Sequence, residues 1–179
     1  MNNFVEHLIA RLGLEPLPFE GGKFKRSYCC PEMISKSALP ERYKSDKPFG
    51  TAIYYLLEPH PDSFSAIHRL ASDEVYHFYL GDPVEMLLLY PNLSYRQILL
   101  GSDILGGQQV QFVVPRGTWQ GSFLRSGGRY ALLGTTMAPG FTDDDFELGQ
   151  RELLMNQYPE VTHLIKRLTR GEQLDKNHT

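Results

Sequence analysis

Short apolar runs separated by turn residues dominate the middle of the chain, from about residue 50 to residue 139. About eight of them follow one another at a spacing of roughly ten residues: GTAIYYLL, SFSAIHRL, EVYHFYL, VEMLLLY, YRQILL, QQVQFVV, WQGSFLR and RYALLGTTM. Runs of this length that are rich in β-branched and aromatic residues are typical of strands. The turns between them leave no room for the crossover helices of a parallel sheet. The pattern therefore predicts an all-β sandwich or barrel.

The two ends of the chain show helical periodicity instead. Residues 4–12 carry apolar side chains along one helical stripe, and Gly13 follows as a C-cap glycine would. Residues 145–169 return to this period, with Pro159 dividing two short helices. We expect one domain over residues 1–170, with a barrel core at about 22–140 between helices at 3–13 and about 145–169. Residues 171–179 are expected to form a flexible tail.

Composition narrows the classes of partner and compartment. The 179 residues carry a formal net charge of −3, which argues against nucleic acid as a partner. No apolar run approaches the roughly 20 residues that a membrane-spanning helix needs, and the first residues lack a signal-peptide pattern. The two cysteines, Cys29 and Cys30, are adjacent, and bridging them to each other would be strained. A reduced, cytoplasmic protein that binds no membrane is expected.

Two short motifs frame the candidate chemistry. His68 precedes Glu74 by six positions, Gly81 follows, and later Pro115 and Gly117 form a Pro-x-Gly turn after an apolar strand. Together these motifs resemble those of the cupin superfamily. A longer resemblance, to the cupin branch labelled "predicted sugar epimerase", is carried by the segments PFEGGKFKRSY, TAIYYLL, SAIHRLASDEVYHFYLGDP, VPRGTWQGSF and MAPGFTDDDFELGQRELLMNQYP. The resemblance implies a double-stranded β-helix, or jelly-roll barrel, with a small-molecule pocket between its two sheets.

The same resemblance raises the question of a metal. A typical cupin motif supplies His-x-His, a glutamate and a later histidine to a divalent ion. Here the second histidine position falls on Leu70 and the last falls on Gln120. Even-numbered and odd-numbered residues of a strand face opposite sides, so His77 shares a face with Glu74 only if a bulge intervenes. We therefore expect no metal cofactor, with a divalent metal as the lesser alternative.

A pocket with unmetallated polar side chains remains. His68 lies on the face of Ala66 and Leu70, which the resemblance places inward, and a neutral imidazole there is suited to act as a base. Glu74 would orient it and stabilise the imidazolium. Epimerases of the cupin superfamily add a tyrosine acid, for which the candidates are Tyr55, Tyr76, Tyr79 and Tyr130. The predicted catalytic set is His68, Glu74 and Tyr79, against the alternative that His68 is a hydrogen-bonded core histidine.

Further side chains are candidates for holding a ligand: His77, Trp119, Gln120, Tyr55 and Tyr130. The indole of Trp119 would stack on a sugar ring or would simply plug the barrel. Arg26 would bind a phosphate or carboxylate, or would be a solvated charge on an edge strand. The acidic run 143–145 resembles a metal loop but reads better as the N-cap of the helix that follows.

Three functions compete. The first is a metal-free epimerase or isomerase that acts on a sugar, sugar nucleotide or other carbonyl-containing metabolite through His68. The second is a binding module that holds a small molecule without converting it. The third is a metal-dependent lyase or oxygenase. Apolar runs such as YYLL and MLLLY exceed what one small barrel must bury, and this favours a homodimer.

Overall fold

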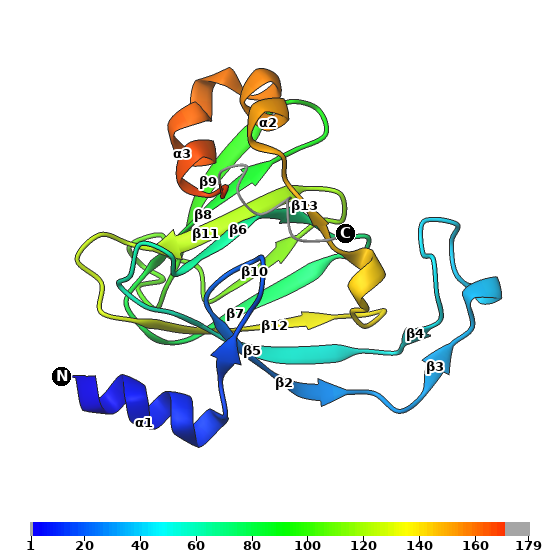
Figure 1. Ribbon diagram of the computed structural model, residues 1–179, viewed down its shortest axis with the longest axis horizontal. Helices are drawn as coiled ribbons and strands as arrows, with labels where there is room; N and C mark the ends of the chain where they lie inside the picture. The colour runs from blue at the N-terminus through cyan, green and yellow to red at the C-terminus, as the bar shows by residue number, and fades with distance from the viewer. Residues whose placement is uncertain (1, 171–179) are drawn as a thin grey trace, which may run out of the picture.

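The computed structural model describes residues 2–170 and shows two sheets packed face to face (Figure 1). The first sheet has the order β1 (Glu15–Pro16), β2 (Lys23–Cys29), β5 (Thr51–Leu57), β12 (Ala131–Met137), β7 (Glu74–Gly81), β10 (Gln111–Val114). The second has the order β13 (Glu147–Leu148), β6 (Phe64–Arg69), β11 (Trp119–Leu124), β8 (Val84–Leu89), β9 (Tyr95–Leu100). The paired strands are antiparallel, and many neighbours are distant in sequence. The predicted all-β jelly roll is confirmed.

Strand alternation sorts the side chains into an inner core and two outer ones. The inner core lies between the sheets and includes Tyr55, Tyr76, Met86, Leu88 and Leu133. The outer face of the second sheet packs against α2 (Arg151–Gln157), η3 (Pro159–Val161) and α3 (Thr162–Arg167). The outer face of the first sheet packs against α1 (Asn2–Leu12) through Leu56 and Leu132. The two helical layers therefore cover opposite sides of the sandwich (Figure 1).

The helical predictions hold at the N-terminus and need correction at the C-terminus. The N-terminal helix covers Asn2–Leu12, against the predicted 3–13. The predicted helix from about residue 145 begins only at Arg151, because Glu147–Leu148 instead adds β13 to the edge of β6. The acidic residues before it form the short 3₁₀ turn η2 (Asp143–Asp145), which Thr142 and Asp145 close as a capping box. The predicted tail, residues 171–179, lies outside the described residues.

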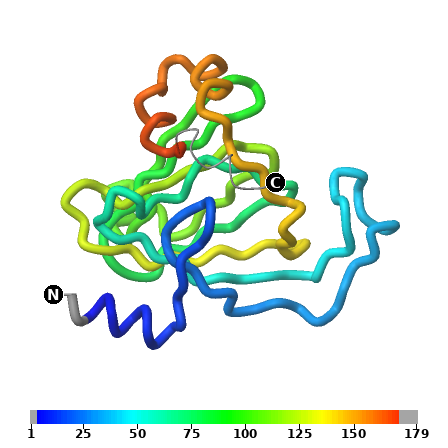
Figure 2. The backbone as a smooth tube through the Cα atoms, in the orientation of Figure 1, coloured from blue at the N-terminus to red at the C-terminus, as the bar shows by residue number. Residues whose placement is uncertain are grey.

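A long excursion between β2 and β5 extends from one end of the sandwich (Figures 1 and 2). It contains β3 (Met33–Ile34), η1 (Lys36–Ala38) and β4 (Lys47–Pro48), and β3 pairs with β4. Its return limb is anchored to the body of the protein. Tyr43 is buried, and its hydroxyl lies 3.0 Å from that of Ser72, while Arg42 donates to the carbonyl of Ala71.

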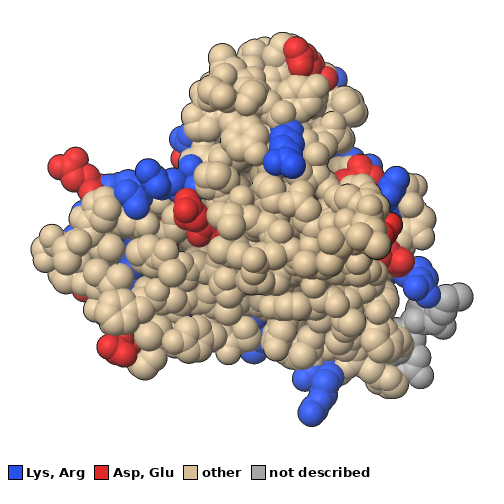
Figure 3. Space-filling model, turned by 180° about the vertical axis from the view of Figure 1, so that it is seen from behind, with Lys and Arg blue, Asp and Glu red and all other residues tan. Residues whose placement is uncertain are grey.

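Three further observations bear on contacts with a membrane or a partner. Within residues 2–170 no helix is long and apolar enough to cross a membrane. Charged side chains are sparse over the middle of the face that is turned away in Figure 1 (Figure 3). Large apolar side chains are exposed on strands of the first sheet, among them Tyr28, Tyr79 and Val113. The homodimer stays a prediction.

Candidate functional site

A cavity of about 80 Å³ lies between the sheets, at the end where the chain passes from β12 to β13. This volume holds a few ordered water molecules or a small organic ligand. Most of its lining is apolar, and a few polar groups converge on it. The lining residues are Leu17, Glu20, Phe24, Arg26, Thr51, Ile53, His68, Leu70, Glu74, Thr135, Met137, Phe141 and Phe146.

The imidazole of His68 borders this cavity, and the residue is 2% exposed. Strand β6 reaches this position through a bulge, since its register against β11 shifts between Ser65 and His68. The ring Nδ1 lies 2.8 Å from the carbonyl oxygen of Ala66, so Nδ1–H donates and the neutral ring keeps its lone pair on Nε2. Phe146 stacks on the ring with centroids 5.1 Å apart. His68 and Leu70 therefore face the cavity, as the resemblance implied, whereas the bulge places Ala66 in the outer core beneath α2 and α3.

Gln120 links His68 to Glu74. The Gln120 amide nitrogen donates to Glu74 Oε2 at 2.6 Å and lies 3.3 Å from His68 Nε2. Both amide hydrogens are thereby used, and the longer contact is weak. The amide oxygen of Gln120 is buried, and no residue within 2–170 donates to it. The structure thus joins His68, Gln120 and Glu74, three predicted site residues, in one hydrogen-bonded chain. The amide oxygen of Gln120 stays available as an acceptor.

Burial governs the protonation of Glu74, which is 6% exposed. Loss of solvation raises the pKa of this carboxyl, an effect that His68 opposes and the charge of Glu20 reinforces. Hydrogen bonds from Thr135 and Gln120 also favour the ionised form. The net direction is upward, so Glu74 holds a proton more readily than an exposed glutamate and can donate it to a bound molecule.

The family is decided by the comparison with known sequences. A family model described as "Cupin superfamily (DUF985)" matches residues 6–149. The chain belongs to this cupin family. An uncharacterized protein of Saccharomyces cerevisiae is 31% identical over 109 residues, which are 58% of this chain and 53% of the yeast protein. The match therefore spans about half the length of that relative.

Two solved structures are similar to this chain over most of their length. A protein from Shewanella oneidensis is 32% identical, with a TM-score of 0.79, 92% of this chain covered and 96% of that one. A hypothetical protein from Leishmania major is 30% identical, with a TM-score of 0.80 and 92% and 97% covered. A cupin 2 domain-containing protein from Halorhodospira halophila, at 13% identity and a TM-score of 0.52, covering 87% of this chain and 88% of that one, shares the fold alone.

Metal binding is common in cupins, but the donor set of this cavity does not fit it. Leu70 lines the cavity at one expected ligand position and has no donor atom. Gln120 stands at another, and its amide nitrogen faces both His68 and Glu74. Among residues 2–170 no three His, Cys, Asp or Glu side chains are grouped so that they could hold a metal ion. His68 and Glu74 are too few ligands for a tightly held divalent ion.

Two predicted site residues on β7 lie on the outer face of the first sheet, away from the cavity. His77 hydrogen-bonds with Thr136 at 3.0 Å, and Tyr79 is 45% exposed and stacks beside His77. The ring of Tyr79 lies over Gly134, where a β-carbon would collide with it. Tyr79 as the catalytic acid is therefore inconsistent with this placement, because residues 77 and 79 share the face opposite to Glu74.

The other two distant residues pack in outer cores. Trp119 is 7% exposed and contacts the cluster beneath α2 and α3, with the guanidinium of Arg69 above its ring. Its neighbour Gln120 faces inward, so the two cannot share the cavity. Tyr130 packs with Phe4 of α1. Of the two interpretations of Trp119, the packing role fits this placement.

Two tyrosines remain inside the sandwich. Tyr55 is 2% exposed and donates its hydroxyl to the carbonyl of Gly21 at 2.9 Å. Tyr76 is equally buried and lies close enough to Glu74 for a side-chain hydrogen bond to raise its pKa. Burial raises both phenol pKa values well above the ordinary 10.0, so both groups are proton donors rather than phenolates. Tyr76 is the one of these two tyrosines whose pKa Glu74 raises through a hydrogen bond, and neither of the two lines the cavity.

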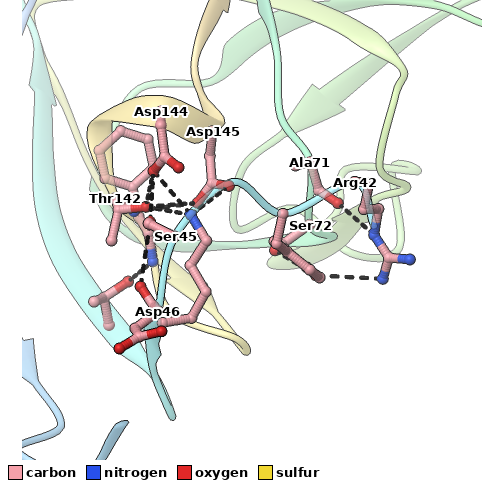
Figure 4. A network of polar contacts seen from close by, with 12 residues as sticks. Arg42, Ser45, Asp46, Ala71, Ser72, Thr142, Asp144 and Asp145 are labelled. Atoms are coloured by element: carbon pink, nitrogen blue, oxygen red, sulfur yellow. Dashed lines mark hydrogen bonds and ion pairs between the residues drawn. The ribbon is translucent and has the colours of Figure 1, made fainter. Parts of the chain in front are cut away.

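A buried ion cluster involves the segment between the lining residues Phe141 and Phe146 and has no counterpart in the sequence predictions. Figure 4 shows Thr142, Asp144 and Asp145 pointing toward a common centre, where the ammonium of Lys47 bonds all three. Lys47 is 0% exposed and lies 2.8 Å from Asp145 and 3.0 Å from Asp144. This cluster ties β4 to the turn whose next residue, Phe146, covers His68. Lys47 lies 95 to 98 residues before the other three members in sequence, so no local pattern signals the cluster.

Proposed function

We propose that this cupin is a metal-free isomerase or epimerase that moves a proton beside a carbonyl group of a small molecule bound in the cavity. The supporting observation is the enclosed chain His68–Gln120–Glu74, which combines a ring lone pair with a carboxyl of raised pKa. Two titratable groups whose surroundings shift their pKa values apart are typical of sites that pair an acid with a base.

The chemistry follows from the protonation states. Nε2 of His68 accepts the proton of a C–H bond next to the carbonyl, and the electron pair of that bond forms the enol double bond. The carbonyl oxygen takes a proton from the protonated form of Glu74, which the raised pKa of this carboxyl favours. With a hydroxy-carbonyl substrate, His68 returns its proton to the former carbonyl carbon while the neighbouring hydroxyl gives its proton to Glu74, and this yields the isomer. A solvent proton delivered to the opposite face of the original carbon yields the epimer. Gln120 then turns its free amide oxygen toward the new Nε2–H.

Substrate size is limited by the cavity. A volume of about 80 Å³ encloses the reacting part of a sugar but not a whole sugar nucleotide. A nucleotide portion would therefore lie outside the mouth. A sugar substrate, as the label "predicted sugar epimerase" suggests, would fit this proposal if only its carbonyl group and the adjacent carbon atoms enter the cavity.

Solvent-exchange NMR tests the proposal on a panel of carbonyl compounds. Wild-type protein is incubated in D₂O with aldoses, ketoses and short oxo acids, and deuterium at the carbon beside the carbonyl is measured. Wild type should incorporate deuterium into at least one compound, and His68→Gln should lose this activity while it keeps its circular dichroism spectrum. His77→Gln, on the outer face, is the matched control and should match wild type. Equal incorporation by His68→Gln would remove His68 from the chemistry.

A second function, ligand binding without conversion, is favoured by one observation. The lone pair of His68 already faces the Gln120 amide, which would keep a bound molecule from reaching it. In that case a compound from the panel would bind, as shown by a raised melting temperature, and would be recovered without deuterium.

A further inference from the structure

Arg26 is the one lysine or arginine among the residues that line the cavity. It lies on β2 opposite Ile53, another lining residue, so the register places the two side chains on the same face of the sheet. Arg26 is exposed, and no ion pair or hydrogen bond joins its guanidinium to another residue within 2–170. A permanently charged, planar donor group is therefore available at the rim of a mostly apolar cavity.

The acidic groups of the cavity define what Arg26 can hold. Glu20 accepts a hydrogen bond from the buried Ser65 hydroxyl at 2.8 Å and adds negative charge near Glu74. Glu20 would repel a ligand with two negative charges, and the single positive charge of Arg26 would neutralise only one of them. A carboxylate carries one charge and matches the two parallel N–H groups of arginine.

The interior end of the cavity requires a neutral polar group. Glu74 tends toward its protonated form, and His68 presents a lone pair at Nε2. A ketone or aldehyde oxygen accepts a proton from Glu74, while the C–H next to it faces the base. The limited volume keeps these groups within a few carbon atoms of the carboxylate.

We propose that the substrate is a short-chain oxo acid, with its carboxylate held by Arg26 at the mouth and its carbonyl at the His68–Gln120–Glu74 chain. This inference rests on the proposed function and specifies its substrate class. The step is a proton transfer: the C–H bond beside the ketone breaks, its proton moves to Nε2 of His68, and its electron pair forms the C=C bond. The ketone oxygen takes a proton from the Glu74 carboxyl and becomes an enol hydroxyl.

Isothermal titration with three probes of similar shape tests the charge preference. Pyruvate carries a carboxylate, pyruvamide replaces it by a neutral amide, and acetylphosphonate replaces it by a group with more negative charge. Pyruvate should bind at least tenfold more tightly than either of the others. Equal affinity of pyruvate and pyruvamide, tighter binding of acetylphosphonate, or no binding of pyruvate would overturn the substrate class.

Variants separate this inference from the proposed function. Arg26→Gln should weaken pyruvate binding at least tenfold and leave pyruvamide unchanged. Lys25→Gln is the matched control, because it removes the same charge from the residue of β2 that precedes Arg26. Lys25 does not line the cavity and forms an exposed ion pair with Glu15. An unchanged pyruvate affinity in Arg26→Gln refutes the role of Arg26, whatever the deuterium assay gives. Arg26-dependent binding without deuterium incorporation supports the carboxylate site and refutes the isomerase.

Discussion

Replacement of Lys47 by methionine should destabilise the protein strongly. Methionine keeps most of the aliphatic length of lysine but removes the ammonium that bonds Thr142, Asp144 and Asp145. The Lys47 and Asp145 side chains are 0% and 1% exposed, so the variant leaves a buried carboxylate without its counter-charge. Breaking a buried pair in this way costs about 3–5 kcal/mol. For a chain of this size the melting temperature should fall by roughly 10 °C.

Urea unfolding followed by circular dichroism measures this loss. The double variant Lys47→Met/Asp145→Asn removes both charges and should recover part of the stability, because an uncharged pair needs no compensation. Lys25→Met is the control at an exposed ion pair, 3.6 Å from Glu15, and should change the free energy of unfolding by less than about 1 kcal/mol.

The same cluster should hold the wall of the cavity. Amide hydrogen exchange of residues 141–148 should accelerate in Lys47→Met more than exchange in the strands of the first sheet. A free energy of unfolding within about 1 kcal/mol of wild type, or a double variant no more stable than the single one, would show that the cluster does not fasten this segment.

Three further changes are expected. Thr142, above all, lowers the pKa of Asp144 to about 2, below its ordinary 3.8. The ionised Asp144 carboxylate therefore stabilises the protein above pH 4. In urea titrations, the free energies of unfolding of wild type and Asp144→Asn should differ there by about 1 kcal/mol and converge as the pH falls toward 2. Burial raises the pKa of Glu74 above 4.5, so wild-type stability should decline as the pH rises through that folded pKa, and Glu74→Gln should lack this decline in the same titrations. Trp119→Phe should lower the free energy of unfolding by about 1–2 kcal/mol and leave deuterium incorporation unchanged, and a loss of incorporation would return the indole to the site.

The strands could be predicted because they depend on local alternation, and the inward face of His68 followed from the resemblance to cupins. Leu70 lines the cavity as the pattern predicts, and Glu74 on β7 faces the same space. The bulge before His68 does not follow from the pattern, and Ala66 packs in the core beneath α2 and α3 instead of sharing the cavity. The orientation of His68 was therefore predicted correctly, although one of the two neighbours used to argue it lies elsewhere.

The remaining site residues depend on contacts between distant segments. Alternation alone separates Tyr79 from Glu74 and Trp119 from Gln120, but it does not tell which tyrosine approaches His68. Phe146 reaches His68 only because η2 and β13 turn the chain from one sheet to the other. Such pairings are set by tertiary packing rather than by local pattern.

Nitrogen-15 NMR of the His68 ring tests the central claim, that a cavity-facing imidazole keeps its Nε2 lone pair for a bound molecule. In the neutral ring the proton should reside on Nδ1, and pyruvate should shift the Nε2 resonance of wild type but not that of the same ring in Arg26→Gln at equal pyruvate concentration. A neutral ring protonated at Nε2, or an Nε2 resonance that saturating pyruvate leaves unmoved, would contradict the account.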